Sequence, residues 1–156
     1  MDHLSKCGDT LVIERANSSH LDVLTRLALK LWPDNTWENL RAEFEELVES
    51  EKDACFLASV EGEYVGFVHM CIRSDYVEGS SSSPVGYVEG IYVEEHFRHR
   101  GLGRMLIEAG EQWSKSKGCA EIASDTELEN MESQVFHKKM GFREAAKIVA
   151  FIKAIE

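Results

Sequence analysis

Short stretches rich in apolar and β-branched residues alternate along the chain with longer stretches in which apolar residues recur every three or four positions. The short stretches predict strands at residues 11–16, 55–73, 85–93, 119–125 and 142–154. Within 55–73 the residues Glu61-Gly62-Glu63 predict a turn, so this stretch forms a hairpin. Residues 85–93 combine β-branched and aromatic side chains, which favour a strand.

Helical spacing marks four further stretches. The first runs from Leu21 to Leu31, after possible N-caps at Asn17 and Ser18, and Pro33 ends it. The others start near Thr36 and cover 101–118 and 130–140, with Gly118 and Gly141 at the ends of the last two. Strands and helices alternate in the second half, which predicts an α/β (α+β) fold with a mixed central sheet and crossover helices. No linker composition interrupts residues 1–156, and we expect one domain.

The composition narrows the classes of partner. A formal net charge of −11 argues against nucleic acid and permits a cationic ligand, although many acidic proteins are acidic only for solubility. No apolar run approaches the roughly 20 residues that cross a bilayer, and the polar N-terminus has no signal-peptide pattern, so we expect a cytoplasmic protein without membrane contact. Cys7, Cys55, Cys71 and Cys119 match no zinc spacing, and we expect no metal.

The segment from Arg98 to Arg104 carries the strongest chemical signal. Its sequence, Arg98-His99-Arg100-Gly101-Leu102-Gly103-Arg104, follows a predicted strand and opens an amphipathic helix. Glycines at a helix entrance let backbone N–H groups approach an anion, and the helix dipole and the arginines add positive charge. It lacks the spacing of a Rossmann fingerprint or a P-loop. The segment predicts a pyrophosphate site; the alternative is an ordinary helix start with solvated arginines.

This R-x-x-G-x-G segment, with its strand before and helix after, resembles motif A of the GNAT acetyltransferases, which binds the pyrophosphate of coenzyme A. The segment FHKKMGF is similar to a second signature of that superfamily, and Asn130 matches its asparagine at a helix start near the cofactor. The resemblance implies the GNAT fold with a splayed parallel strand pair, and acetyl-CoA as co-substrate. It implies that the backbone of Ile91, Tyr92 and Val93 binds the acetyl group and pantetheine. His137 stands where a tyrosine general acid is usual.

Three other segments resemble a bacterial group of aminoglycoside 6′-N-acetyltransferases. They are KLWPD, the long stretch from Ile72 to Val93, and ASDTELEN. In that group the residues matching Trp32, Tyr76, Glu89 and Asp125 contact the aminoglycoside. The alternative for Trp32 and Tyr76 is ordinary packing, and the alternative for Asp125 is an N-cap of the following turn. The resemblance also implies a homodimer.

The residues fit the chemistry that the resemblance implies. A carboxylate must bind a substrate ammonium and take its proton before the amine attacks a thioester, and Glu89 is the candidate, unless it is only an exposed strand carboxylate. His137 can protonate the leaving group, or it is a packed helix histidine. No cysteine has a visible activating partner, so we expect direct transfer in a ternary complex. Ala146 and Ala150 stand where related enzymes often carry an acidic residue and a tyrosine.

Two other functions remain open. A GNAT enzyme acting on another amine, such as a polyamine or a peptide N-terminus, would keep the cofactor segment and Glu89. A non-catalytic acyl-CoA-binding module would keep only the cofactor segment, and the carboxylate beside the predicted acetyl site argues against it.

Overall fold

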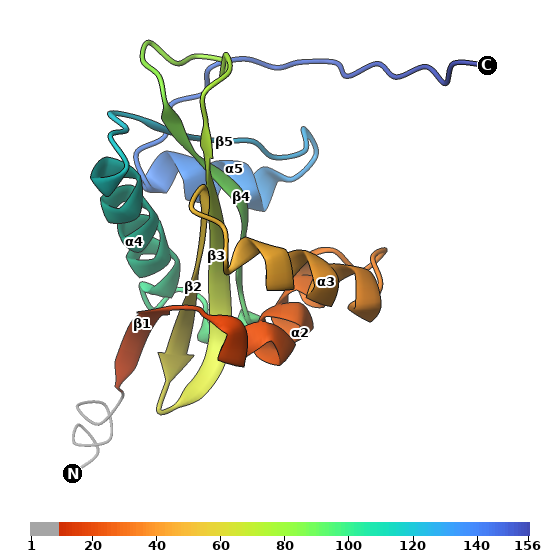
Figure 1. Ribbon diagram of the computed structural model, residues 1–156. Helices are drawn as coiled ribbons and strands as arrows, with labels where there is room; N and C mark the ends of the chain where they lie inside the picture. The colour runs from red at the N-terminus through yellow and green to blue at the C-terminus, as the bar shows by residue number, and fades with distance from the viewer. Residues whose placement is uncertain (1–9) are drawn as a thin grey trace.

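A five-stranded sheet forms the centre of the protein (Figure 1), as seen in a computed structural model that describes residues 10–156. Its strands lie side by side in chain order, β1-β2-β3-β4-β5. The first four are antiparallel neighbours, and β4 and β5 are parallel, so the sheet is mixed as predicted. The strands are β1 (Leu11–Arg15), β2 (Asp53–Val60), β3 (Glu63–Arg73), β4 (Val85–Val93) and β5 (Ile122–Ser124).

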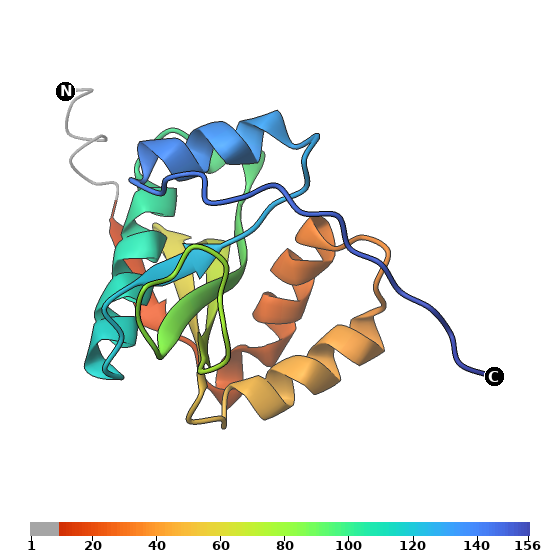
Figure 2. The same ribbon diagram turned by 90° about the horizontal axis from the view of Figure 1, so that it is seen from above.

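The helices cover both faces of this sheet (Figure 2). Helices α2 and α3 lie on one face and α4 on the other, with α5 beside α4. Asn17 caps the short 3-10 helix that precedes α2, Thr36 caps α3 and Asn130 caps α5. The bounds are η1 (Ser18–His20), α2 (Leu21–Leu31), α3 (Trp37–Leu47), η2 (Glu95–Phe97), α4 (Leu102–Ser116) and α5 (Met131–Lys139). No helix within residues 10–156 is long and apolar enough to cross a membrane.

The two faces of the sheet have separate apolar cores. On the α4 face, Val68, Met70 and Val88 pack against Leu106, and Phe136 of α5 packs onto this cluster. On the α2 and α3 face, Leu24, Phe44, Leu57 and Phe67 form the second cluster, which Trp32 and Tyr92 adjoin. Since side chains alternate between faces along a strand, β2, β3 and β4 contribute to both cores.

An irregularity in β4 lies at Glu89. His69 of β3 pairs with Gly90, and Met70 pairs with Val88. Glu89 is therefore an extra residue that has no partner on β3. Such a bulge shifts the alternation of side chains by one residue. Tyr87 and Tyr92 therefore lie on the same face of the sheet, although they are an odd number of residues apart. The parallel pairing with β5 ends at Val88 and Ser124, just before the bulge.

The predicted closing strand at residues 142–154 is wrong. Residues 142–156 form neither helix nor strand, and from residue 143 on they make up an extended C-terminal arm that runs away from the body (Figures 1 and 2). The arm begins on the loop after β3, where Arg143 Nη2 donates to the carbonyl of Gly79 at 3.1 Å. Beyond that point its pattern is that of a strand, but a strand needs a neighbour that supplies backbone hydrogen bonds. Residues 142–156 pair with no strand of the described chain.

Candidate active site

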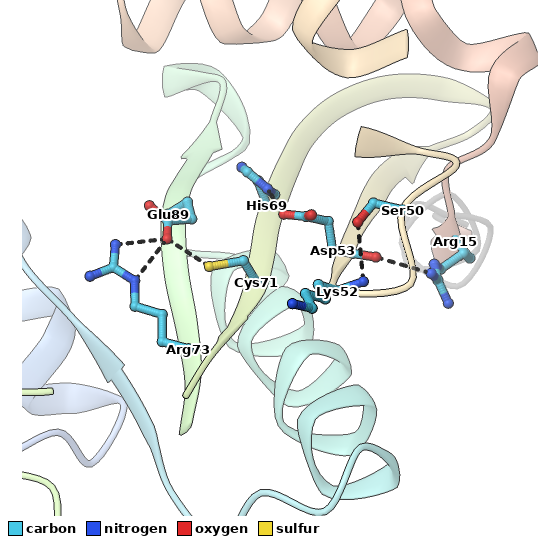
Figure 3. Close-up of polar contacts among 8 residues, drawn as sticks. All are labelled: Arg15, Ser50, Lys52, Asp53, His69, Cys71, Arg73 and Glu89. Atoms are coloured by element: carbon cyan, nitrogen blue, oxygen red, sulfur yellow. Dashed lines mark hydrogen bonds and ion pairs between the residues drawn. The ribbon is translucent and has the colours of Figure 1, made fainter. Parts of the chain in front are cut away.

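Glu89, at the bulge of β4, is held by two residues of β3 (Figure 3). The Cys71 thiol donates to Glu89 Oε2 at 2.7 Å, and Arg73 donates to the same oxygen from Nη2 at 2.8 Å and from Nε at 3.2 Å. The Glu89 side chain keeps 28% of its surface exposed. Glu89 is therefore a partnered, half-buried carboxylate, unlike the free surface carboxylate that the sequence left as the alternative.

The contacts of Glu89 continue across the sheet to Asp125. The guanidinium carbon of Arg73 lies 3.5 Å from the centroid of the Tyr87 ring, which is a close cation–π contact. The Tyr87 hydroxyl in turn donates to Asp125 Oδ2, just beyond β5. Burial, and next the hydrogen bond to Asp125, raise the pKa of Tyr87 above its ordinary value. Asp125 thus accepts a phenol hydrogen bond, and the N-cap of α5 is Asn130.

Trp32, the residue that follows α2, lies beside Gly90, the residue after Glu89. The space next to Gly90 is filled by the Trp32 indole, and a Cβ built on Gly90 would approach ring carbons Cζ2 and Cη2 at 2.5 Å. The ring also meets Phe67 edge to face, with centroids 6.2 Å apart. Tyr76 is separate from this group: its side chain is 78% exposed, and its hydroxyl donates to Glu78.

The start of α4 has the features of an anion site. Gly101, the N-cap residue, has a φ of +87°, a conformation open to glycine, and nothing lies within 4 Å of a Cβ built there. No side chain of residues 10–156 caps the first turn of α4, so its free N–H groups and dipole end face outward. Gly103 is also required, since its Cβ would approach Cε1 of Phe136 at 2.8 Å.

The three arginines of this segment differ in their contacts. Arg98 donates from Nε to the carbonyl of Val93 at 2.7 Å and pairs with Glu132 of α5 at 3.1 Å. Arg100 stacks over Phe97, and Arg104 reaches the carbonyl of Lys139 at 3.3 Å. His99 adopts a positive φ of 64°, which is uncommon outside glycine. Arg98 thus ties the loop to the end of β4 and to α5, whereas Arg100 lies over the Phe97 ring.

The strand between the anion site and Glu89 has one free edge. Ile91, Tyr92 and Val93 pair with β3 on one side, opposite Val68, Phe67 and Gly66. On the other side β5 has already ended at Ser124, so no strand of residues 10–156 pairs with the last part of β4 there. This matches the splayed parallel pair that the resemblance implied, and the backbone polar groups of this edge are available to an extended ligand.

His137 lies on α5 close to the end of β5. Its Nδ1 is 2.7 Å from the carbonyl oxygen of Ser133, and its Nε2 is 2.8 Å from Ser124 Oγ. Because a carbonyl only accepts, Nδ1 carries a hydrogen and Nε2 faces the Ser124 hydroxyl. Asn130 uses Oδ1 to cap α5, by accepting from the Ser133 N–H at 3.0 Å, which leaves its amide NH₂ for another partner.

Sequence reasoning missed Cys71, Arg73 and Tyr87 as parts of the site. Their proximity depends on the β3–β4 register, in which Cys71 and Tyr87 are direct partners, and the sequence alone contains no signal for that register. It also missed Glu121, which anchors the serine loop by accepting from the Ser81 N–H at 2.9 Å and from the Ser82 hydroxyl. These hydrogen bonds, above all the one from Ser82, lower the pKa of Glu121.

The comparisons with known proteins agree with this geometry. Residues 22–142 match the family described as the acetyltransferase (GNAT) family. An aminoglycoside N(6′)-acetyltransferase type 1 of Salmonella typhimurium is 40% identical over 141 residues, which cover 90% of this chain and 97% of that protein. The structure of aminoglycoside N-acetyltransferase AAC(6′)-Iy in complex with CoA has a TM-score of 0.92 and 38% identity, and covers 95% of this chain and 97% of its own. AAC(6′)-Iy in complex with the bisubstrate analogue CoA-S-monomethyl-acetylneamine has a TM-score of 0.90 at the same 38% identity, with 94% and 99% covered.

Proposed function

We propose, from the premise that this chain belongs to the GNAT family of acetyltransferases, that it acetylates the 6′-amino group of aminoglycoside antibiotics and so confers resistance to them. The proposal treats residues 1–156 as one acetyltransferase domain and acetyl-CoA as the acetyl donor. The observation that carries it is the position of Glu89, a half-buried carboxylate at the point where β4 and β5 separate. The similarity to relatives that are named for this reaction supports the choice of substrate.

The residues present fit coenzyme A. The uncapped first turn of α4, with Gly101, Leu102 and Gly103, accommodates a pyrophosphate, and Arg100 and Arg104 add charge. The free edge of Ile91, Tyr92 and Val93 suits an extended pantetheine arm, and the Asn130 amide lies at the facing helix start. When bound, acetyl-CoA supplies the acetyl group already activated as a thioester.

Glu89 performs the proton chemistry on the acceptor in this proposal. Its Oε1 atom binds the 6′-ammonium and accepts a proton, directly or through a water, which leaves the lone pair on nitrogen free to attack. Asp125 and Trp32 bind the rest of the cationic sugar, by charge and by an apolar ring face. Tyr76 contacts the drug from the exposed loop. Backbone N–H groups near Ile91 to Val93 polarise the carbonyl under attack.

His137 acts on the leaving sulfur through Ser124 in this proposal. The Ser124 hydroxyl passes its proton to the sulfur while it receives one from Nε2 of a protonated His137, so the balance of protons is kept. Direct transfer within a ternary complex follows because the thiols of Cys55, Cys71 and Cys119 are not activated: each has a raised pKa, mainly through burial. Burial, the largest cause, and next the hydrogen bond to Glu89 raise the pKa of Cys71 to about 12.

We further propose a cytoplasmic homodimer. Acetyl-CoA is an intracellular metabolite, which supports the location. The C-terminal arm supports the dimer, because its apolar side chains are uncovered: Ile148 is 75% exposed, Phe151 91% and Ile152 101%. Such a run is rare on the surface of a monomer, and a second copy of the chain, with its own free sheet edge at β5, provides both the cover and the backbone partner.

Release of CoA in the presence of acetyl-CoA and a panel of aminoglycosides tests the proposal. Half of the panel should lack a 6′-amine. Turnover confined to the 6′-amino drugs, with an acetylated 6′ nitrogen in the product by mass spectrometry and NMR, is the expected result. Tight acetyl-CoA binding without turnover of any of them would overturn the substrate and send the search to polyamines and peptide N-termini.

A further inference from the structure

In the described part of the chain, only one of the two carboxylate oxygens of Glu89 is paired with a positively charged side chain, that of Arg73. All three hydrogen bonds from Cys71 and Arg73 end on Oε2. Within residues 10–156, Oε1 accepts no hydrogen bond, and Arg73 is the only cation paired with this carboxylate. The other oxygen is therefore the one presented to a ligand. In the proposed function, on which the role of Arg73 inferred below rests, that ligand is an amine.

Arg73 is held rigidly in its place. Its guanidinium carbon lies over the Tyr87 ring, 3.5 Å from the centroid. Its Nε and Nη2 both donate to Glu89, as Figure 3 shows. A planar guanidinium fixed in this way loses little further freedom when a ligand arrives. The Arg73 side chain nevertheless keeps 42% of its surface exposed. The charge is thus anchored on one side and open to the ligand on the other.

A charge in this place has two effects on an amine bound at Oε1. It keeps the Glu89 carboxylate oriented, and it repels a neighbouring ammonium while leaving a neutral amine almost untouched. Only the neutral amine has a lone pair with which to attack a carbonyl carbon. A bare carboxylate would hold the ammonium more tightly but in its unreactive form.

We propose that Arg73 is a positioning residue that fixes Glu89 through Oε2 and, by its charge, favours the neutral form of the acceptor amine. The N–H bond of the ammonium breaks, its proton passes to Oε1 of Glu89 or to water, and the electron pair stays on nitrogen. Arg73 itself neither gains nor loses a proton.

The other groups that face this cluster do not provide the same effect. Cys71 of β3 and Tyr87 of β4 have pKa values raised mainly by burial, so both stay neutral across the working range. Asp125, beyond β5, is a second carboxylate and favours the ammonium. Arg73 is accordingly the only positive charge among the groups that contact Glu89, Tyr87 or Asp125 in residues 10–156.

The test compares Arg73→Gln, Arg73→Lys and Cys71→Ala with wild type, in steady-state kinetics with a 6′-amino aminoglycoside from about pH 6 to 9. Arg73→Gln should lower kcat about tenfold at neutral pH and lower KM for the drug, because the ammonium binds better and reacts worse. Its kcat should reach the plateau about one pH unit higher than wild type, as a nearby like charge shifts an amine by a unit or more. Arg73→Lys, which keeps the charge, should restore most of the profile.

Two controls separate this effect from loss of structure. Arg15→Gln removes another arginine that ends a strand and lies over a ring, 5.9 Å from the Phe56 centroid, on the edge strand β1. It should leave the profile unchanged. Cys71→Ala removes a hydrogen bond to Oε2 but no charge, so it should alter kcat without moving the profile.

Either of two results would overturn the inference. An Arg73→Gln enzyme whose pH profile matches wild type shows that the charge does not act on the amine. A profile shift in Cys71→Ala as large as that in Arg73→Gln would mean that only the orientation of Glu89 matters. If wild type itself turns over no 6′-amino drug, the proposed function has failed, and the role of Arg73 fails with it. If wild type is active but Arg73→Gln has the wild-type pH profile, only the inference on Arg73 is wrong.

Discussion

The Trp32 indole lies against the bare backbone of Gly90, the residue next to the candidate base Glu89. A Cβ at Gly90 would come within 2.5 Å of two indole carbons. Gly90→Ala must therefore displace the ring from its place beside β4. We expect the KM for an aminoglycoside to rise about tenfold, as for the loss of one good contact, while acetyl-CoA affinity, measured by calorimetry, stays the same. An unchanged KM would mean that Trp32 only packs and does not contact the drug.

Glu89→Gln tests the base directly. The amide keeps the shape of the side chain but neither accepts the proton nor pairs with Arg73, so kcat should fall at least about a hundredfold, as for other general bases. Acetyl-CoA binding, measured by calorimetry on the same protein, should not change. A comparable loss in acetyl-CoA affinity would point to a disturbed β4 in place of a lost base.

Asp125→Asn removes the second carboxylate of the proposed acceptor site. The amide can still accept the Tyr87 hydroxyl, but it has no charge for a drug ammonium, so KM for the aminoglycoside should rise several-fold with kcat little changed. The matched variant is Tyr87→Phe, which keeps the charge of Asp125 and removes its hydrogen bond. An unaltered KM in Asp125→Asn would mean that Asp125 accepts the Tyr87 hydrogen bond but does not bind the drug.

Most of the fold follows from local signals that a single sequence contains. Helices α3 and α5 start where predicted, at the caps Thr36 and Asn130, and Gly118 and Gly141 end α4 and α5 with positive φ. The predicted cap Asn17 caps the 3-10 helix η1 that leads into α2, and no side chain of residues 10–156 caps α2 itself. The prediction of a closing strand at residues 142–154 is wrong for a physical reason. The side-chain pattern shows which residues favour a sheet, but not whether the same chain supplies a strand for them to pair with.

The candidate site was predictable only where its functional residues are contiguous in the sequence. The turn from Arg98 to Gly103 was visible because its glycines and arginines are contiguous. The contact of Arg73 with Glu89 joins two strands through a bulge, and a bulge leaves no reliable mark in residue types. The joint placement of Tyr87 and Asp125 needs the parallel register of β4 and β5. Long-range register is what a single sequence without its structure does not supply.

Gly101→Ala and Gly118→Ala form a matched pair at the two ends of α4. The two glycines have φ values of +87° and +89°, and neither has an atom within 4 Å of a built Cβ. Each alanine should cost about 1–2 kcal/mol of folding free energy from the left-handed backbone alone. Only Gly101→Ala should also weaken acetyl-CoA binding, since only Gly101 opens the anion site. Equal losses of affinity in the two variants would refute a special role for the Gly101 turn.

The apolar side chains of the C-terminal arm should control the oligomeric state. If Ile148, Phe151 and Ile152 are covered by a second copy of the chain, a protein that ends after Lys147 should be a monomer by light scattering, whereas the full chain is a dimer. The double change Ile148→Asp and Phe151→Asp should act in the same way, because charged groups are costly to bury without partners. Val12→Asp, at an apolar position that is 41% exposed on β1, is the control and should leave the dimer intact. A full-length protein that is monomeric at micromolar concentration would show that a second copy of the chain does not cover these apolar side chains.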